Sequence, residues 1–398
     1  MNLVIDAANI DAGGAFKQLV SFARFAAESE TNVELHCANS SGYVEALHDT
    51  TVKIKLLSWL NRAKEIDVSV DPSLGSFARV ARLGLVSYWR GRRLPQILRD
   101  ERADVLFNPN AILPRRRIRS CAYVVMSQNA LPFDDVARNL FCSVSDRTKL
   151  ALIRRSQIRA LSQADGVAFI SSYAARNISA QVPALCGTKT INYLGVDDAI
   201  FYPLHHDPSS QRELKIIYVS DLLPYKHHAE VLTALSEIRR LYAGKFRLDL
   251  VGGDWKGTKR KLTTQAKMLG VQDYVRFHGR VSEATVAILL RESDIGLFAT
   301  SCENCPTTLI EKMKSGLAIA SSNVGPMPEI LGNAGLYFNP RSPAEIATAL
   351  QRLLDDTQLR VRMRAAAIVR ARDFSVAKHN AALLAFMHQV AAASRNTG

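Results

Sequence analysis

Short apolar runs alternate with helical stretches along the whole chain, and this alternation limits the possible folds more than any other feature. The runs of the first half are strand-like, with helical segments between them, and they cover residues 2–6, 33–38, 104–108, 123–127 and 166–171. Strands that follow one another through helices form a parallel sheet with helices on both faces. The first half therefore predicts a doubly wound α/β domain.

The same pattern begins again after the segment 201–210, which holds two prolines and two histidines and lacks apolar periodicity. Strand-like runs follow at 215–219, 246–251, 274–278, 295–299 and 318–321. We expect a first domain over residues 1–204, a second over 205–376, and an amphipathic helix at 377–394 that is able to pack back onto the first. Such sheets bind ligands outside the carboxyl ends of their strands.

Composition narrows the class of protein. Hydrophobic residues make up 47% of the 398 residues and charged residues 22%, close to the globular average, which excludes a disordered or fibrous chain. No apolar run approaches the roughly 18–20 residues that cross a bilayer. Residues 1–6 lack the basic and apolar regions of a signal peptide, so we expect a cytoplasmic protein.

Much of the net charge of +14 is concentrated in one segment. Between Arg79 and Arg119 the chain has eleven arginines and three acidic residues, a local charge of +8 that suits an anionic partner. The arginines singled out as a membrane or acceptor patch are Arg79, Arg82, Arg90, Arg93, Arg115, Arg116 and Arg117. Phe77, Tyr88 and Trp89 would add aromatic contacts if a basic helix lay on an anionic membrane. An ordinary solvated face is the alternative, and nucleic acid is disfavoured because no recognition module is evident.

The six cysteines do not favour a metal site. Only Cys302 and Cys305 have C-x-x-C spacing, which is half of a zinc site, and no second pair completes it. The other four stand in apolar or strand-like contexts typical of small core residues. We therefore expect no bound metal.

The most informative segment covers residues 294–316. A buried strand ends near Thr300, a loop follows, and a helix begins at Pro306, which has no N–H to leave unpaired. The first amides of that helix, those of Thr307 and Thr308 among them, lack acceptors within the helix. Together with the positive end of the helix dipole they predict an anion site.

Two glutamates flank this helix start. Glu303 lies in the loop before the helix, and Glu311 lies one to two turns inside it. Their carboxylates are too far apart to act as one pair, but they suit two hydroxyl-bearing groups on either side of a bound phosphate. Taken alone, both are also compatible with ordinary solvated charges.

Glu303 and Glu311 have the spacing of the E-x7-E motif, and here the chain resembles the GT-B retaining glycosyltransferases of family 4, in a subgroup with E-N-C-P at residues 303–306. Other family motifs occur in the expected order over most of the chain, at 13–14, 170–173, 194–197, 218–226, 277–282, 328–330 and 335–337. The resemblance implies two Rossmann-like domains that face a cleft. It also implies transfer of a sugar from a nucleotide-diphosphate donor with retention at the anomeric carbon.

The resemblance assigns roles to residues of the second domain. Glu303 would hold hydroxyls of the donor sugar, and Glu311 would hold those of the nucleotide ribose. Lys226 would lie on the donor diphosphate together with the amides of Thr307 and Thr308. Glu303 and Lys226 are thus the residues that we expect to act in catalysis, by fixed charges aimed at the leaving phosphate.

The resemblance also completes the donor site. Gly13 and Gly14 would let the backbone of the first domain approach the phosphate and the sugar, although they also suit a plain turn. Asn129 stands where the family has a histidine, so it is either a hydrogen-bond donor to the sugar or a structural loop residue. The residues that would line the base are Gly279, Arg280 and Val281.

Some nearby residues have less specific interpretations. Asp221 is acidic where the family often has an arginine, so the phosphate clamp would depend on Lys226 and the helix start. His227 and His228 are interpreted as solvated or capping residues. Glu329 either caps a helix near the nucleotide or supports the loop, and we favour support of the loop.

The expected function is transfer of a hexose from a UDP- or GDP-sugar to a lipid-linked saccharide, in the synthesis of a bacterial surface polysaccharide such as O-antigen, capsule or exopolysaccharide. The expected partners are the nucleotide-sugar, the lipid-linked acceptor and an anionic surface at the inner face of the plasma membrane. No metal, no other cofactor and no nucleic acid are expected.

Rival functions stay open at this stage. A sugar-nucleotide epimerase or a phosphorylase would use the same two-domain cleft, and a non-catalytic scaffold partner would keep the fold without turnover. A nicotinamide dehydrogenase is disfavoured because residues 11–15 lack G-x-G-x-x-G spacing.

Overall fold

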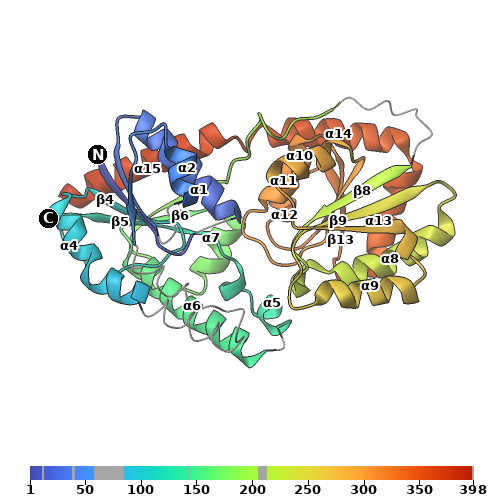
Figure 1. Cartoon of the computed structure of the whole chain (residues 1–398), viewed down its shortest axis with the longest axis horizontal. Coiled ribbons are helices and arrows are strands. Elements are labelled where there is room, and N and C mark those ends of the chain that lie inside the picture. The colour runs from blue at the N-terminus through green and yellow to red at the C-terminus, as the bar shows by residue number, and fades with distance from the viewer. Residues whose placement is uncertain (11–12, 38–40, 58–84, 142, 205–212, 397–398) are drawn as a thin grey trace.

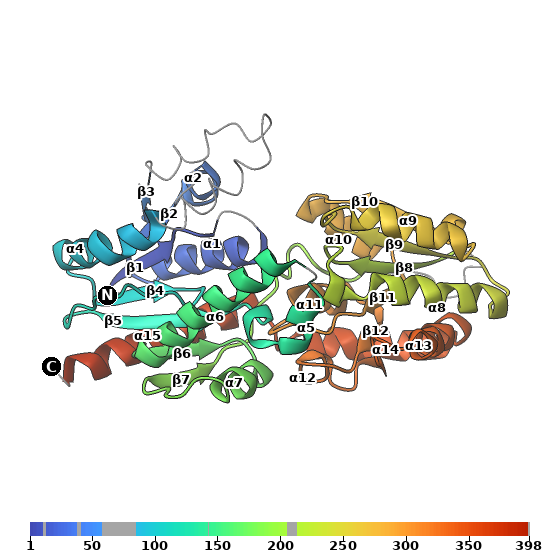
Figure 2. The same ribbon diagram turned by 90° about the horizontal axis from the view of Figure 1, so that it is seen from below.

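A computed structural model of the chain shows two lobes side by side, each built around a parallel sheet (Figure 1). The structure describes residues 1–10, 13–37, 41–57, 85–141, 143–204 and 213–396. Helices cover both faces of the sheets (Figure 2). The predicted fold class, two Rossmann-like doubly wound α/β domains, is confirmed.

The described residues of the first lobe form a seven-stranded sheet in the order β3-β2-β1-β4-β5-β6-β7, with parallel pairing throughout. Its strands are β1 (Asn2–Ala7), β2 (Asn32–Cys37), β3 (Lys53–Leu56), β4 (Val105–Asn108), β5 (Ala122–Ser127), β6 (Gly166–Phe169) and β7 (Thr188–Ile191). Its helices are α1 (Gly13–Glu28), α2 (Ser41–Leu47), α4 (Leu94–Asp100), α5 (Asp135–Asn139), α6 (Val144–Gln163) and α7 (Ser172–Ser179), with a 3-10 turn η2 (Leu131–Phe133). Helical residues 85–92 lead into α4.

The described residues of the second lobe form a six-stranded sheet in the order β10-β9-β8-β11-β12-β13, again parallel. Its strands are β8 (Leu214–Val219), β9 (Phe246–Val251), β10 (Val275–Gly279), β11 (Ile295–Phe298), β12 (Ala318–Ser322) and β13 (Gly335–Phe338). Its helices are α8 (His228–Leu241), α9 (Thr258–Met268), α10 (Glu283–Arg291), α11 (Thr307–Lys314), α12 (Met327–Leu331), α13 (Pro343–Asp355) and α14 (Thr357–Ala371), with 3-10 turns η3 (Pro224–Lys226) and η4 (Gln272–Tyr274).

The predicted apolar runs correspond to strands of both sheets, whereas β3, β7 and β13 have no predicted counterpart. Each of these three is four residues long and lies at an edge of its sheet. The residues of β7 are mostly exposed. An edge strand is covered on fewer sides than a central one, so its sequence carries a weaker apolar signal.

The strand order reverses between β1 and β4 in the first sheet and between β8 and β11 in the second. Ligand crevices of such sheets open at this point, outside the carboxyl ends of the strands. Residues at the carboxyl ends of β5 and β6 touch the loop after β11: Ser171 Oγ donates to the Asn304 carbonyl at 2.6 Å, and Asn304 Nδ2 donates to the Ser127 carbonyl at 3.4 Å. The two carboxyl edges therefore face each other.

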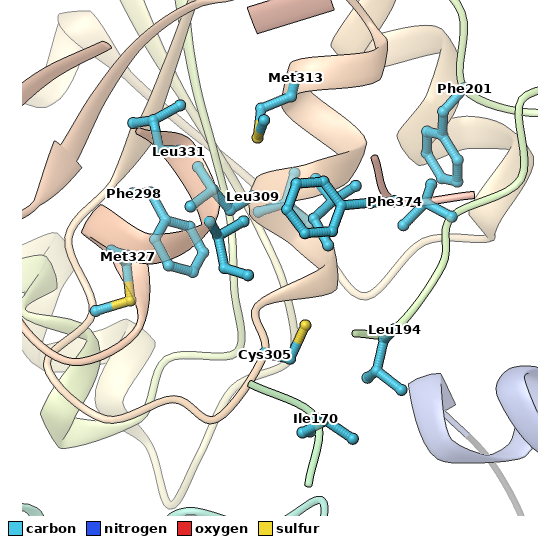
Figure 3. Close-up of a cluster of buried hydrophobic side chains, with 14 of the residues drawn as sticks. Ile170, Leu194, Phe201, Phe298, Cys305, Leu309, Met313, Met327, Leu331 and Phe374 are labelled. Atoms are coloured by element: carbon cyan, nitrogen blue, oxygen red, sulfur yellow. The ribbon is translucent and has the colours of Figure 1, made fainter. Parts of the chain in front are cut away.

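Buried apolar side chains continue from one lobe into the other. Figure 3 shows Ile170 and Leu194 of the first lobe beside Cys305 and Leu309 of the second, within one cluster. Phe374, in the segment where the chain returns to the first lobe, belongs to the same cluster. Separating the lobes here would expose apolar surface, at a cost of roughly 25 cal/mol per Å².

The last helix, α15 (Val376–Asn396), follows the second lobe in sequence but packs against α1, β5 and β6 of the first. Both ends of the chain therefore lie on the first lobe (Figure 1). The packing is close, because a Cβ on Gly166 would lie 2.7 Å from Val390. The domain boundaries stay a prediction, and residues 205–212 at the first of them lie outside the described part.

One histidine of α15 makes this packing sensitive to acid. His379 is buried, its Nδ1 lies 3.0 Å from the Tyr193 carbonyl, and burial lowers its pKa to about 4. Between pH 6.5 and pH 4 the unfolded chain binds a proton at this position that the folded protein does not. The free energy of unfolding therefore falls as the pH falls through this range.

We expect His379→Gln to remove about 3 kcal/mol of the acid destabilisation, the free energy that corresponds to this pKa difference. Denaturant unfolding gives the free energy of unfolding of wild type and variant at pH 7.5 and at pH 4. The change between the two pH values is then compared between the two proteins. The control is His388→Gln, because His388 is exposed on the same helix. An equal pH dependence in wild type and His379→Gln would contradict the prediction.

Arg90 and Trp89 do not belong to an exposed basic face, contrary to the prediction. Both are buried, with 6% and 2% of their surface exposed. Arg90 Nε and Nη2 bind the two carboxylate oxygens of Asp6 at 2.6 and 3.1 Å, and Asn108 Nδ2 donates to Asp6 Oδ2 at 3.0 Å. Arg90 thus neutralises a buried carboxylate at the end of β1.

The other arginines of the predicted patch have mixed positions. Arg79 and Arg82, like Phe77, lie outside the described residues. Arg93, Arg115 and Arg116 are exposed, whereas Arg117 pairs with Asp165 and stacks on the ring of Tyr123. Within the described residues, no helix is both long and apolar enough to span a bilayer.

We expect Arg90→Met to lower the free energy of unfolding by about 3–5 kcal/mol, because it leaves the Asp6 carboxylate buried without its cation. The exposed Arg93 gives the matched control, and Arg93→Met should change stability by less than about 0.5 kcal/mol. Denaturant unfolding measures both. Equal, small effects would mean that Arg90 does not hold the first lobe together.

Candidate active site

Two loops at the reversal point of the second sheet bring opposite charges together. Lys226 comes from the loop after β8, Glu303 comes from the loop after β11, and the Lys226 ammonium pairs with Glu303 Oε1. Their side chains are only 13% and 20% exposed. The two residues predicted to act in catalysis are therefore neighbours, although 77 positions separate them.

Buried hydrogen bonds fix these two loops to each other. His227 Nε2 lies 2.8 Å from Ser301 Oγ, the Ser301 amide donates to the Tyr225 carbonyl at 2.9 Å, and the Tyr218 hydroxyl donates to the Lys226 carbonyl at 2.9 Å. His227 has a left-handed φ of 53°, which turns the chain from η3 into α8. The backbone on both sides of the Lys226–Glu303 pair is thus held in place.

His227 and His228 are both buried, so they are not solvated, whereas the capping alternative fits His227, which is the N-cap residue of α8. His228 stacks on the ring of Tyr218 at 4.8 Å, and burial lowers its pKa to about 3. This support was not predicted, because a histidine pair after a lysine gives no signal of burial. The strand that carries Tyr218 was predicted, but its position beside His228 is known only from the fold.

Helix α11 begins beside Glu303. Its N-cap is Pro306, so the helix starts one residue later than predicted, and Thr307 and Thr308 form its first two positions. Both are partly buried, and their amides have no acceptor within the helix. The helix start therefore offers amides and a positive dipole end next to Lys226 and Glu303.

Glu311 lies further along α11 and is separate from this pair. Burial raises the pKa of Glu311, while the neighbouring cations Lys312 and Lys17 act against this rise. Lys17 belongs to α1 of the first lobe and pairs with Glu283 of α10 at 2.6 Å. Glu311 thus lies where an ion pair joins the two lobes.

A buried lysine of α11, Lys312, was also not predicted. The Lys312 ammonium donates to the Thr308 carbonyl at 3.1 Å and lies 5.3 Å from the centre of the Phe298 ring. Gly296 provides room, because a Cβ there would lie 3.0 Å from Lys312 Cδ. Helical periodicity alone would have placed this charge at the surface.

Gly13 and Gly14 start α1 on the first lobe. Gly13 has a φ of +82°, which favours glycine, and a Cβ on either residue would meet nothing within 4 Å. The Lys17–Glu283 pair, one turn further along, shows that this end of α1 faces the second lobe. Open space beside both glycines fits their predicted role, which stays a prediction.

Asn129 is engaged in its own loop. Its Oδ1 accepts a hydrogen bond from the Leu131 amide at 3.1 Å, which leaves its amide nitrogen as the group able to meet a ligand. Ala130 and Leu131 pack with Tyr225 and Cys302 in one small apolar cluster. This loop therefore lies directly against the residues that precede Lys226 and Glu303.

Asp221 has a structural role that explains its acidic character. Its carboxylate accepts from the Gly253 amide at 2.6 Å and pairs with Arg280 at 3.0 Å. Gly279 has a φ of +73° with open space at its Cβ position, and Val281 packs on the core. The predicted base-lining residues therefore share one loop, which Asp221 fastens to the loop after β9.

Glu329 caps a helix, the less favoured of its two predicted roles, and that helix belongs to the other lobe. Its carboxylate accepts from the amides of Ser172 and Tyr173 at 2.6 and 2.8 Å and from the Tyr193 hydroxyl at 2.7 Å. These amides form the N-terminus of α7, where a negative charge is favourable. The carboxylate thus caps a helix of the first lobe from the second.

Cys302 and Cys305 are both buried, and burial raises the pKa of each thiol, that of Cys305 to about 12. Such thiols are poor nucleophiles and poor metal ligands. No group of three metal-ligating side chains occurs among the residues that the structure describes.

Residues 206–370 match the protein family described as Glycosyl transferases group 1. A GDP-mannose-dependent alpha-(1-6)-phosphatidylinositol monomannoside mannosyltransferase of Mycobacterium tuberculosis is 31% identical over 239 residues, which cover 54% of this chain and 59% of the relative. O-antigen chain mannosyltransferase B of Escherichia coli is 21% identical over 292 residues, which cover 71% and 74%.

The match covers 59% of the length of the mycobacterial relative.

Solved structures match the whole fold. A sucrose-phosphate synthase from Thermosynechococcus elongatus has a TM-score of 0.72 at 14% identity, with 99% of this chain and 100% of the other covered. An Anabaena protein in complex with UDP and glucose has a TM-score of 0.69 at 15% identity, with 98% and 100% covered. The likeness to these structures shows the fold.

We expect Glu329→Gln to loosen the contact between the lobes, because glutamine has one acceptor oxygen and no charge to replace two bonds from α7. Amide exchange at Ser172 and Tyr173 should accelerate roughly tenfold to a hundredfold. Hydrogen exchange followed by mass spectrometry measures it. Glu292→Gln, at a surface pair with Lys215, is the control. Unchanged protection of both amides would show that the carboxylate does not hold α7.

Proposed function

We propose that this chain is a retaining glycosyltransferase that moves a hexose from a UDP- or GDP-sugar to a lipid-linked saccharide acceptor. The observation that carries the proposal is the partly buried Lys226–Glu303 pair beside the start of α11. A cation, a carboxylate and free helix amides at one point suit a ligand that has both phosphate and hydroxyl groups.

The proposed chemistry follows from these charges. Breaking the anomeric C–O bond of the donor leaves a nucleoside diphosphate, and negative charge develops on its β-phosphate. Lys226 and the amides of Thr307 and Thr308 would stabilise that charge in the transition state. Glu303 would release Lys226 when the donor binds and would accept hydrogen bonds from the sugar, while Glu311 would hold the ribose. No metal is required if these groups suffice.

The names of the relatives support the choice of substrates. One is named for GDP-mannose and a phosphatidylinositol mannoside, and another for the O-antigen chain. The Anabaena structure contains UDP and glucose. We therefore propose a lipid-linked acceptor and a place in bacterial surface polysaccharide synthesis, with the protein at the inner face of the plasma membrane. The exposed arginines Arg93, Arg115 and Arg116 suit that surface.

The test is a thermal-shift titration with UDP, GDP, ADP and their sugar conjugates, with and without EDTA. Binding to the folded protein should stabilise it by about 2.7 kcal/mol at a hundredfold excess over the dissociation constant. Lys226→Ala should abolish the shift with every ligand and lower turnover about 10²- to 10³-fold. Glu303→Gln should keep the shift with the nucleotide but lose the additional shift with its sugar conjugate.

Matched controls are Lys267→Ala and Glu292→Gln, which change exposed residues of the second lobe. Absence of any nucleotide effect would overturn the proposal. Nucleotide binding without transfer to any acceptor would favour the scaffold alternative, and isomerisation of the donor without an acceptor would favour an epimerase. Retention is tested by the anomeric configuration of the product.

A further inference from the structure

A cavity of about 890 Å³ is lined by residues of the first lobe. It opens between α6 and the helical residues 85–92, and the loop that leaves the carboxyl end of β4 closes its base. No described residue of the second lobe lines it. Its volume is in the range of sites for small organic ligands, roughly 300–1,000 Å³. None of the residues assigned to the donor site takes part in it.

The charge of this cavity has one sign. Arg115, Arg155 and Arg159 line it, and its described lining contains no acidic residue. Arg90 also lines it but is neutralised by Asp6. Among the described residues, neither Arg115 nor Arg155 has a carboxylate partner at salt-bridge distance.

Arg159 is the least satisfied of these cations. It is partly buried, and its Nη2 donates to the Leu113 carbonyl at 3.0 Å. Its Nε is buried and has no hydrogen-bond partner among the described residues. Burial and the nearby charge of Arg115 lower the pKa of Arg159. Holding two like charges close together without a counter-charge costs free energy, and an anion between them would offset it.

The remaining walls are apolar. Ile112, Leu113 and Ile158 lie inside, while Tyr88 and Leu152 at the lining are 63% and 65% exposed. Large apolar side chains this exposed beside unpaired cations suit a ligand that is anionic at one end and apolar at the other. A nucleotide or a free phosphate would leave the apolar walls uncovered.

We propose that this cavity binds the head of a phosphate-bearing lipid, with the phosphate between Arg115, Arg155 and Arg159 and the hydrocarbon along Tyr88 and Leu152. The inference deepens the proposed function, because it names where the lipid part of the acceptor, or a lipid of the membrane, is held. The inference rests on the proposed function only where it chooses between the acceptor lipid and a membrane lipid as the source of the phosphate. The loop from β4 places the cavity close to the carboxyl edge that faces the donor site.

The test measures binding to the full chain by calorimetry, with three probes that separate the contributions. Decyl phosphate should bind more tightly than inorganic phosphate and more tightly than decyl maltoside, which has the same chain without the charge. Arg155→Gln should weaken binding of decyl phosphate about tenfold or more. The control is Arg372→Gln, because Arg372 is exposed on the second lobe, and it should leave binding unchanged.

Arg155 is exposed, so its substitution should not affect folding, and Leu152→Asn gives a second variant on the apolar wall. Equal affinity for decyl phosphate and decyl maltoside, or for decyl phosphate and inorganic phosphate, would overturn the proposal. So would an equal loss in Arg155→Gln and Arg372→Gln. A preference for farnesyl diphosphate or for short-chain phosphatidylglycerol identifies the source of the lipid, and either preference supports the site.

This outcome is separable from that of the proposed function. Arg155→Gln should keep the full thermal shift with the nucleotide, because the cavity shares no residue with the Lys226–Glu303 pair. Loss of lipid binding with intact nucleotide binding supports the cavity. Nucleotide binding without any lipid phosphate binding in the wild type would reject the cavity alone.

Discussion

Parallel strands all end at one edge of their sheet, and in this protein the two sheets turn those edges towards each other. The loops after β8 and β11 carry Lys226 and Glu303, the start of α1 carries Gly13, and β10 ends at Gly279. The predicted donor residues therefore lie at the carboxyl ends of strands, in the loops that follow, or on helices that begin there. Hydrogen bonds between the lobes, such as those from the start of α7 to Glu329, hold the two edges in place relative to each other. The topology of the two sheets thus determines where the candidate site lies, and the side chains of the loops determine what it is able to bind.

Positive charge is concentrated in two places, the candidate donor site and the cavity of the first lobe. Lys226 and the start of α11 supply positive charge where a diphosphate would lie, Glu303 balances it, and Glu311 stands apart beside the ion pair that joins the lobes. The second zone of positive charge, around Arg115, Arg155 and Arg159, has apolar walls in place of hydroxyl-binding carboxylates. Two arginines that line the cavity therefore differ in their environment: Arg90 pairs with the buried Asp6, whereas we propose that Arg155 binds a ligand.

The support of the site is as informative as the site itself. His227, Ser301 and Tyr218 fix the backbone around Lys226 and Glu303, and Lys312 lies buried below them. None of these residues was predicted to matter. Each becomes significant only through a partner from another element, such as Ser301 for His227 or Phe298 for Lys312, and a single sequence does not show such partners.

The sequence by itself determined the fold class, the two repeated α/β patterns and the pairing of Glu303 with a helix start, because apolar periodicity and helix-terminal residues are local signals. It also indicated Lys226 through an ordered series of motifs. Only the tertiary structure decided which charges are buried. It placed Arg90 inside against Asp6, gave Glu329 a partner in the other lobe, and brought Arg155 and Arg159 of α6 to the loop of Arg115. The physical reason is that burial and ion pairing depend on residues far apart in the chain, and the local pattern of charge is the same whether a side chain meets solvent or a carboxylate.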